Sequence, residues 1–299
     1  MKLSCARIYS LLLVSLIVLT SPFYAIADNS KTLLFADTGI AGLEELQRQF
    51  GEFQKVLSEK SGYTIKFMPV TSRTAVVEAL RSKKLDLALT GPAEYVVIRK
   101  RTSAFPIVGL VRPDYFSDIV VLASGPIKSL TDLKGKRVAF GDVGSTSYHL
   151  APMQILKDNN IDPLKDISAM HIAKQIAWDA LKKGDVAAIG FGNERFVQFR
   201  EQEKELDSGS FRVIARGPDL PNDLIIAGAH VAPEAVEAIK KAFRENQSEM
   251  ASAILAGSAN TKYGQMKFVT DIQDHDYDYV RSMYITAGFP EYSEFVGEG

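Results

Sequence analysis

The sequence predicts an α/β protein of two lobes, joined by two crossing segments that leave a ligand cleft between them. Three observations predict this arrangement. Short apolar runs alternate with amphipathic helical patterns after residue 28, which is typical of parallel sheets covered by helices. The alternation breaks at turn-rich residues around Pro113 and again around Pro221. With 46% hydrophobic and 24% charged residues among 299, the chain can bury a substantial core.

The first 27 residues have the pattern of a secretory signal peptide. Lys2 and Arg7 precede an apolar run at 11–20, and Ala25-Ile26-Ala27 supplies the small residues before a signal peptidase site. We therefore expect cleavage after Ala27 and an exported chain in the periplasm. The alternative is an N-terminal anchor helix, but a membrane span needs about 20 apolar residues and this run is shorter. We expect no direct membrane anchor.

The first predicted lobe starts with a strand at 32–36. Apolar residues between 43 and 57 then recur at spacings of three and four, which places them on one helix face, and Gly62 ends this helix. Pro92 begins a later short helix, at a position where its missing N–H is not needed. The other expected elements of this lobe are a helix at 72–85 and strands at 63–70, 86–90 and 107–111.

The second predicted lobe repeats the alternation. A strand at 138–140 leads into a helix at 146–159, and a helix at 173–183 ends at Gly184, with two lysines in its last turn where cations suit the helix dipole. Trp178, in the middle of that helix, is expected to pack in the core. The remaining strands are expected at 119–123, 167–172, 186–191 and 211–215.

The chain then returns to the first lobe. An apolar run at 224–227 marks the return, and helices are expected around 236–243 and at 277–286. At the first crossing, Tyr115 and Phe116 could pack in the hinge or line the cleft. The predicted limits are 28–116 and 220–299 for the first lobe and 117–219 for the second.

The segment most informative about chemistry lies where the strand at 138–140 meets the following helix. Gly144 is followed by Ser145, Thr146 and Ser147, three hydroxyl residues at the expected helix start. The first amides of a helix lack intrahelical acceptors and carry a partial positive charge. Together with three hydroxyls they could hold several oxygens of one anion. The alternative is ordinary N-capping, although a cap needs only one hydroxyl.

The segment from Asp132 to Pro152 resembles the periplasmic phosphate, phosphite and phosphonate-binding proteins of ABC transporters, and 90–95 is similar to their glycine-proline-x-x-tyrosine segment. The resemblance implies a two-lobed periplasmic-binding-protein fold and a solute-binding protein that captures a small oxyanion for a permease. It assigns the oxyanion's oxygens to the side chains and amides of Ser145, Thr146 and Ser147.

The resemblance also implies first-lobe contributions to the site. Tyr95 would close over the anion from the opposite lobe, and Gly91 belongs to the same glycine-proline segment. Thr38 follows the first strand, where the family's pocket begins, and ligands of open α/β sheets bind at the carboxyl ends of strands. We therefore include all three among the expected ligand-binding residues.

Several positions depart from the family's pattern. Tyr148 and His149 follow Ser147, where the family usually has glycine. Counting back from the glycine that ends the next helix, Lys174 stands at the family's histidine, and we expect it in or near the cleft. The alternative is that Lys174 simply lies on the surface of the first turn of a helix, although this is an unfavourable place for a cation. Whether His149 or His171 contacts the ligand stays open.

Neutral residues replace the family's acids. Ala187 stands where aspartate is common, and Gly192-Asn193 where an acidic residue is usual. Acidic groups would favour a protonated oxyanion or an aminophosphonate, because they accept a proton or pair with an amine. Their replacement suits a more highly charged anion and argues against an aminophosphonate, while the particular oxyanion stays open.

The sequence contains no catalytic signature. It lacks G-x-S-x-G, H-E-x-x-H, a Walker loop and a dinucleotide fingerprint, so we expect neither an enzyme nor a cofactor. Asp274-His275-Asp276 could seed a metal site, but a solvated loop is the simpler interpretation, and no metal is expected. Cys5 is the only cysteine and belongs to the predicted signal peptide, so the mature chain would have no thiol.

The charge balance restricts the partners. The chain carries 35 Lys and Arg against 36 Asp and Glu and has no basic block, so nucleic acid is not an expected partner. The expected partners are a small oxyanion and an ABC transporter permease. The alternative is a periplasmic sensor component that presents its ligand state to a histidine kinase, since the same fold could serve either. The sequence leaves the oligomeric state open.

Overall fold

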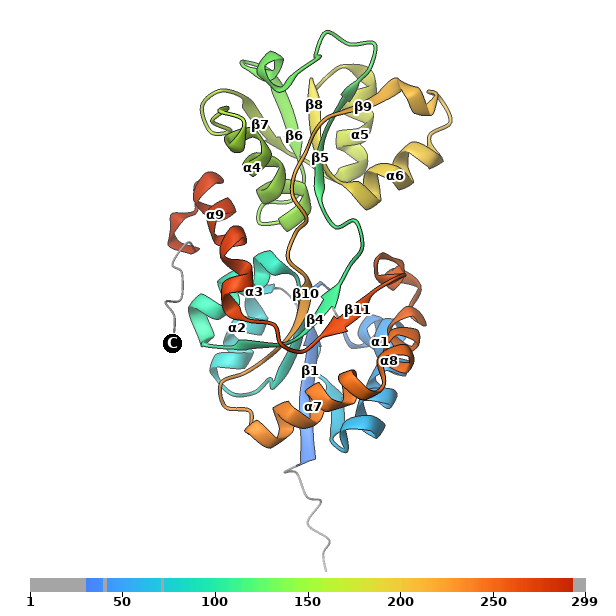
Figure 1. Cartoon of the computed structure of the whole chain (residues 1–299), viewed down its shortest axis with the longest axis vertical. Coiled ribbons are helices and arrows are strands. Elements are labelled where there is room, and N and C mark those ends of the chain that lie inside the picture. The colour runs from blue at the N-terminus through green and yellow to red at the C-terminus, as the bar shows by residue number, and fades with distance from the viewer. Residues whose placement is uncertain (1–30, 40–41, 71–72, 293–299) are drawn as a thin grey trace, which may run out of the picture. The chain divides into compact units, whose positions relative to one another are not determined.

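The computed structural model of the chain describes residues 31–39, 42–70 and 73–292. The predicted signal peptide lies outside the described residues. Within them the chain forms two β-sheets of six and five strands, and helices cover both faces of each sheet (Figure 1). The predicted two-lobed α/β fold is confirmed.

The sheet of the first lobe is mixed. β1 pairs in parallel with β2 and β3, whereas β10 pairs antiparallel with β3 and β4, and β11 pairs antiparallel with β4. The carboxyl ends of β1 and β3 therefore lie at one edge, where the Thr38 N–H donates to the Leu89 carbonyl at 3.0 Å. In spatial order the strands are β11 (Lys267–Val269), β4 (Phe105–Val111), β10 (Asp223–Ala227), β3 (Leu87–Thr90), β1 (Thr32–Asp37) and β2 (Thr64–Phe67).

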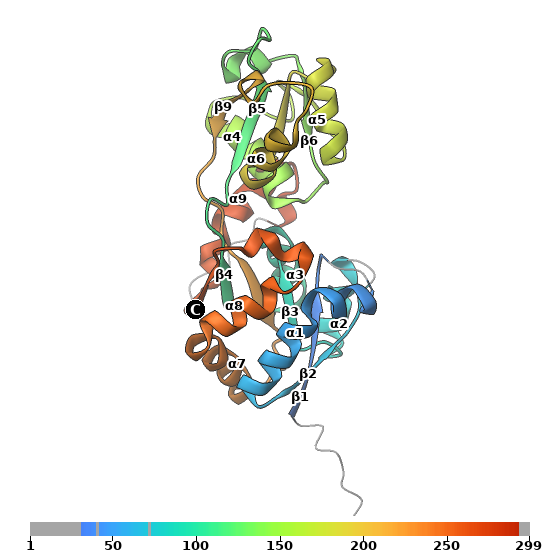
Figure 2. The same ribbon diagram turned by 90° about the vertical axis from the view of Figure 1, so that its right-hand side faces the viewer.

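Two sets of helices cover this sheet. α1 (Leu43–Ser61), α7 (Pro233–Glu245) and α8 (Gln247–Leu255) lie on one face, and α2 (Arg73–Arg81) and α3 (Pro92–Thr102) on the other (Figure 2). Beneath the first set, Phe53 packs against Phe35 and Phe243, with ring centroids 5.6 and 6.0 Å apart. Gly62, at φ +74°, ends α1 as predicted, in a left-handed conformation that glycine adopts without strain.

The second lobe contains a smaller mixed sheet. α4 (Ala151–Asp158) covers one face, and α5 (Lys174–Lys183) and α6 (Asn193–Gln202) cover the other. Trp178 is buried between α5 and the sheet, stacked on Phe211 with centroids 4.2 Å apart, as predicted for a core residue. In spatial order the strands are β7 (Ser168–His171), β6 (Arg137–Phe140), β8 (Ala188–Gly192), β5 (Ser117–Leu122) and β9 (Phe211–Arg216).

Two segments cross between the lobes, one from β4 to β5 and one from β9 to β10. They run side by side, because the Leu220 N–H donates to the Tyr115 carbonyl at 2.7 Å and the Gly217 N–H to the Ser117 carbonyl at 2.9 Å. Both predicted crossings are therefore present, and their pairing forms the hinge.

The C-terminal helix α9 (Asp278–Thr286) contacts both lobes: it packs on α3 of the first and on α4 of the second. The Thr286 hydroxyl donates to Gln154 Oε1 at 2.6 Å, and the Tyr284 hydroxyl donates to the Ala93 carbonyl at 3.0 Å. This helix was predicted, but its contact with the second lobe was not. The exact lobe limits, 28–116, 117–219 and 220–299, stay a prediction.

Asp118, in β5 next to the crossings, is a buried carboxyl. It is 2% exposed, and its Oδ2 has no hydrogen-bond partner among the described residues. Burial raises its pKa from 3.8 to about 7, while Arg216 acts in the opposite direction. Because the folded-state pKa lies above the unfolded value, the contribution of Asp118 to stability is fully present below pH 4 and is lost as the pH rises through 7.

We expect Asp118→Asn to remove this pH dependence. Relative to the wild type, the variant should gain free energy of unfolding between pH 4 and 7, by up to about 1.4 kcal/mol per pH unit. Urea unfolding at pH 5 and pH 8 measures the difference, with the exposed Asp185→Asn as control. If the variant and the wild type differ in free energy of unfolding by the same amount at both pH values, Asp118 ionises normally.

Candidate functional site

The three-hydroxyl segment stands between β6 and α4. The chain turns at Gly144, at φ +84°, a conformation that side chains with a Cβ disfavour. Ser145 is the N-cap of a π-helical turn, Thr146–Leu150, in which the Leu150 N–H donates to the Ser145 carbonyl at 3.0 Å. This turn runs directly into α4. No side-chain hydroxyl caps the turn, so the geometry does not favour the interpretation of the three hydroxyls as a simple N-cap.

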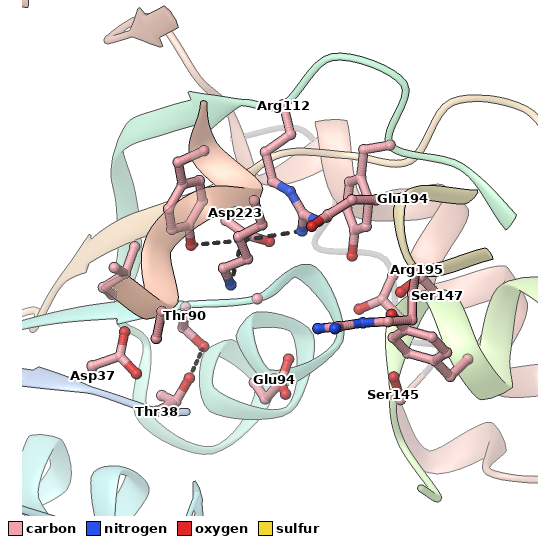
Figure 3. A pocket seen from close by; sticks show the side chains of 18 of the residues that line it. Asp37, Thr38, Thr90, Glu94, Arg112, Ser145, Ser147, Glu194, Arg195 and Asp223 are labelled. Atoms are coloured by element: carbon pink, nitrogen blue, oxygen red, sulfur yellow. Dashed lines mark hydrogen bonds and ion pairs between the residues drawn. The ribbon is translucent and has the colours of Figure 1, made fainter. Parts of the chain in front are cut away.

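A cavity of about 240 Å³ lies at the carboxyl ends of strands from both sheets (Figure 3). This is where ligands bind in open α/β sheets. Both crossing segments reach it, since it includes Arg112 and Tyr115 before β5 and Asp223 at the start of β10. The lining residues are Asp37, Thr38, Leu89, Thr90, Gly91, Glu94, Arg112, Tyr115, Ser145, Thr146, Ser147, Tyr148, Lys174, Glu194, Arg195, Asp223, Ala259, Thr261, Lys262 and Tyr263.

The structure brings most of the predicted site residues together in this cavity. Lys174 Nζ lies 4.4 Å from the centroid of the Tyr148 ring, at the edge of the three-hydroxyl segment. On the opposite wall the Thr38 hydroxyl donates to the Thr90 hydroxyl at 3.2 Å. The predicted residues that line the cavity are Thr38, Gly91, Ser145, Thr146, Ser147 and Lys174.

Tyr95 is not among the lining residues. Its ring is fully buried in the first lobe, 4.8 Å from the ring of Tyr277, and its hydroxyl donates to the carboxylate of Asp274. Burial and this carboxylate raise the pKa of Tyr95. Helix geometry explains the difference from the prediction: successive residues of α3 are turned by about 100°, so Glu94 faces the cavity and Tyr95 faces the core. Its position does not fit a residue that closes over the ligand.

A different tyrosine, Tyr115, lies in the cavity wall. It lines the same cavity as Thr146, and its ring centroid lies 3.9 Å from the guanidinium carbon of Arg112. The sequence left open whether this residue packs in the hinge or lines the cleft. It does both, because it belongs to the first crossing segment and to the cavity.

The lobes also touch through the three-hydroxyl segment itself. Thr146 Oγ1 accepts a hydrogen bond from the Ala93 N–H at 3.1 Å, in the first turn of α3. α3 has no side-chain cap at Gly91, so the hydroxyl from the second lobe provides the acceptor that this helix start lacks. Arg112 and Glu194 form a second interlobe contact, an ion pair at 3.1 Å.

Four basic side chains line the cavity: Arg112, Lys174, Arg195 and Lys262. Figure 3 shows the Arg195 side chain extending from the side of Ser145 and Ser147 across the cavity. Arg112 is largely buried, and its Nε has no hydrogen-bond partner within the described part of the chain. A buried donor of this kind gains from an acceptor that a ligand could supply.

Four carboxylates, Asp37, Glu94, Glu194 and Asp223, line the same cavity. The neutral residues at Ala187 and Gly192-Asn193 therefore do not leave the cavity without acids, because other positions supply carboxylates. An aminophosphonate is consequently no longer disfavoured on that ground.

Asp223 is the most buried of these carboxylates, at 3% exposed. Its Oδ2 accepts from the Tyr263 hydroxyl at 2.7 Å and lies 3.3 Å from Lys262 Nζ and 3.4 Å from Arg112 Nη1. Burial acts to raise the pKa of Asp223, but Lys262, Arg112 and the Tyr263 hydroxyl outweigh it and hold that pKa below the usual value. Asp223 is therefore a carboxylate that fixes its basic neighbours in place.

The remaining sequence candidates lie elsewhere. His149 and His171 line a separate cavity and do not line the one just described. His275 is exposed and lies 3.6 Å from Asp276. Within residues 31–39, 42–70 and 73–292, no group of three or more His, Cys, Asp or Glu side chains is arranged to hold a metal ion.

A cleft between hinged α/β lobes, lined by hydroxyl, guanidinium and ammonium donors, defines a substrate-binding protein for a small anion. The family described as the periplasmic substrate-binding protein of phosphonate ABC transporters matches residues 42–277. The chain therefore belongs to this family. Its members bind and deliver substrates and are not enzymes, in agreement with the prediction.

Individual relatives agree with this assignment. The phosphate-import protein PhnD of Mycolicibacterium smegmatis is 25% identical over 281 residues, which cover 86% of each chain. The structure of a binding protein component of an ABC phosphonate transporter from Pseudomonas aeruginosa has a TM-score of 0.62 at 18% identity and covers 90% of each chain. PhnD1 of Prochlorococcus marinus in complex with methylphosphonate has a TM-score of 0.60 at 20% identity and covers 87% of this chain and 100% of that one.

The family is periplasmic. Among the helices in the described ranges, none combines the length and the apolar character that a bilayer crossing requires.

The two tyrosines allow a matched test. Tyr95→Phe should lower the free energy of unfolding by about 1.5–3 kcal/mol, the contribution of a hydrogen bond to a charged acceptor, and leave ligand affinity unchanged. Tyr115→Phe removes a hydroxyl from the cavity wall and should weaken binding by about two- to tenfold, with little loss of stability. Urea unfolding and calorimetric titration with phosphate and methylphosphonate measure both. A large affinity loss in Tyr95→Phe alone would restore the original assignment.

Proposed function

We propose that this chain captures a small tetrahedral oxyanion of phosphorus, such as phosphate, phosphite or a phosphonate, in the cleft and delivers it to the permease of an ABC transporter. One observation carries the proposal: Ser145, Thr146 and Ser147 share one cavity with Arg112 and Arg195.

These groups have complementary roles. The hydroxyls and the first amides of the helical turn can donate to several oxygens at once, and the helix start favours negative charge. Guanidinium groups add charge-assisted hydrogen bonds, often two to one oxyanion, and these are stronger than hydrogen bonds between neutral groups. The Nε of Arg112, which has no hydrogen-bond partner among the described residues, is one donor that such a ligand could satisfy.

The interlobe hydrogen bond suggests how the ligand is coupled to hinge closure. In the structure Thr146 Oγ1 occupies the acceptor position at the Ala93 N–H. An oxyanion bound between the lobes could accept from this amide and from the Thr146 hydroxyl, and so join the starts of α3 and of the helical turn. Ligand binding would then favour the closed arrangement of the hinge.

The four carboxylates would select among oxyanions. A carboxylate in an anion site repels a fully ionised ligand but accepts a hydrogen bond from a P–OH group or pairs with an amine. Glu94 lies on the wall opposite Ser145 and Ser147 (Figure 3), so a ligand with a phosphoryl group at one end and a donor at the other would satisfy both walls. Comparing 2-aminoethylphosphonate with ethylphosphonate separates the two kinds of donor.

The relatives support a phosphorus oxyanion, since one is named for phosphate import and another was crystallised with methylphosphonate. These relatives are named for import and transport and not for sensing, so the histidine-kinase alternative gains no support. The permease as partner and cleavage after Ala27 complete the proposal, and the signal-peptide pattern of residues 1–27 supports the second.

A thermal-shift screen followed by calorimetry tests the site. Phosphate, phosphite, methylphosphonate, 2-aminoethylphosphonate, ethylphosphonate and sulfate form the panel, and a ligand at 100 times its Kd stabilises by about 2.7 kcal/mol. Thr146→Val keeps the shape of the side chain and removes one hydroxyl. We expect it to weaken binding about ten- to a hundredfold, since a hydrogen bond to a charged group contributes about 1.5–3 kcal/mol.

The matched control is Thr102→Val at the far end of α3, whose hydroxyl donates to the Ile98 carbonyl and accepts from the Ala104 N–H, both local contacts outside the cavity. Its affinity should equal that of the wild type. If Thr146→Val also binds like the wild type while folded, the three hydroxyls do not hold the anion. If no phosphorus oxyanion shifts the wild-type melting temperature, the proposed ligand class is wrong.

A further inference from the structure

We propose that His149 and His171 are positioning residues for the anion site. From outside the ligand cavity they hydrogen-bond to the loop 141–145 and so fix the position of the three hydroxyl residues, the first of which ends this loop. The proposal rests on the function proposed above for Ser145, Thr146 and Ser147. It gives a role to two histidines that do not line the ligand cavity.

His149 holds the end of the loop next to the hydroxyls. Its side chain is 1% exposed, and its Nδ1 accepts a hydrogen bond from the Gly144 N–H at 2.9 Å. The backbone N–H of His149 donates to the Ser145 carbonyl at 3.2 Å. Because Gly144 has the left-handed φ that the turn requires and directly precedes Ser145, this bond fixes the position at which the donor array begins.

His171 holds the other end of the loop. Its Nδ1 lies 3.1 Å from the Gly141 carbonyl oxygen. A carbonyl can only accept, so Nδ1 of His171 carries a proton, whereas Nδ1 of His149 must be unprotonated to accept from an amide. The two rings are packed edge to face, with centroids 4.6 Å apart. The pair therefore anchors both ends of the loop, one ring as donor and the other as acceptor.

The surroundings keep His149 in this state. The two histidines share a cavity of about 330 Å³ with side chains from α4, β7 and the segments that follow Asp162 and α9. Of the described residues that line it, the histidines alone are titratable; the others are Val143, Met153, Pro163, Leu164, Ile167, Ala169, Ala287 and Phe289. No carboxylate in that lining is available to stabilise a proton on His149.

Burial, and secondarily the neighbouring His171, lower the pKa of His149 to about 4. The ring is therefore neutral at the pH of ordinary buffers, and Nδ1 stays available to the Gly144 amide. A protonated His149 would lose this acceptor. Acid would then loosen the loop, although protonation of the cavity carboxylates would by itself strengthen anion binding.

Two variants of His149 separate the hydrogen bond from the shape of the ring. Asn places an amide oxygen close to the position of Nδ1 and does not titrate, whereas Phe keeps a ring and has no acceptor. We expect the Gly144 amide of His149→Phe to exchange with solvent at least tenfold faster than in the wild type, and that of His149→Asn to exchange at nearly the wild-type rate. Amide exchange by NMR needs no ligand, so this readout stands even if the proposed ligand class fails.

Affinity provides the second readout. In calorimetry with inorganic phosphate and with methylphosphonate at pH 7, His149→Phe should bind about tenfold more weakly than the wild type and His149→Asn within about twofold of it. As the pH falls from 6 to 4, the ratio of wild-type to His149→Asn affinity should fall, because the wild type alone loses its acceptor. This ratio cancels the titration of the ligand and of the cavity carboxylates.

If His149→Phe does not fold, His171→Phe against His171→Asn repeats the comparison at the Gly141 end, since the Asn amide still donates to that carbonyl. A purely structural role would lower the thermal midpoint of the Phe variants but leave Gly144 exchange and affinity unchanged in the folded protein. That result would overturn the proposal. Wild-type binding of neither anion, together with the expected exchange pattern, would count against the proposed ligand class and not against the positioning role.

Discussion

The carboxylate of Asp223 is buried at the start of β10, where the returning crossing segment joins the first sheet, and it is held by Tyr263, Lys262 and Arg112. A buried charge of this kind is costly unless it is paired and hydrogen-bonded. The need to satisfy Asp223 therefore fixes Arg112 on the other crossing segment. Arg112 in turn pairs with Glu194 of the second lobe, so one buried carboxylate links the first lobe, the hinge and the opposite wall of the cavity.

This arrangement explains how an anion site can exist without an excess of positive charge. The whole chain has a formal net charge of −1, and the cavity contains four basic and four acidic side chains. A uniform attractive field is therefore absent, and attraction must come from the direction in which the donors point. In the proposed site, Ser145, Thr146 and Ser147 would provide short-range donors, and the carboxylates would oppose ligands that bring no hydrogen of their own. Such a site is better suited to discriminating between oxyanions that do and do not carry a hydrogen-bond donor than to attracting anions in general.

The fold was predictable from the sequence because its signals are local. The helix end at Gly62, the helix start at Pro92 and the alternating apolar runs are each read within a few residues, and the structure differs from them mainly at element ends. α6 was not predicted, because charged residues surround its helix and only Phe196 is buried. α8 and the three-residue β11 gave no clear pattern either.

The site was predictable only where it is contiguous. Three hydroxyls in a row after Gly144 are visible in the sequence. The basic residues of the cavity are far apart in the chain: Arg112 lies in a crossing segment, Arg195 in the unpredicted α6, and Lys262 in the 3-10 turn Ser258–Tyr263. Nothing local marks them as neighbours. The Arg112-Pro113-Asp114 break beside Tyr115 was the one available signal, and it indicated a hinge. For Tyr95 the error was one residue of helix phase, which moved the cavity contact to Glu94.

α9 adds a constraint to the hinge that neither crossing segment supplies. Arg281 of this helix is 1% exposed and contacts both carboxylate oxygens of Asp274 at 2.9 Å, and Asp274 also accepts from Tyr95 of α3. Arg281 and Asp274 belong to the same C-terminal segment, so this segment is held to the first lobe by the Tyr95 hydroxyl, by an Arg99–Asp274 ion pair at 3.5 Å and by the hydrogen bond from the Tyr284 hydroxyl to the Ala93 carbonyl. To the second lobe, among the residues that the structure describes, α9 donates the hydrogen bond from Thr286 to Gln154, which contributes about 1 kcal/mol net. Opening of the cleft should therefore leave α9 packed on the first lobe and separate it from α4. The contact between α4 and α9 is then the one that breaks when the ligand is released.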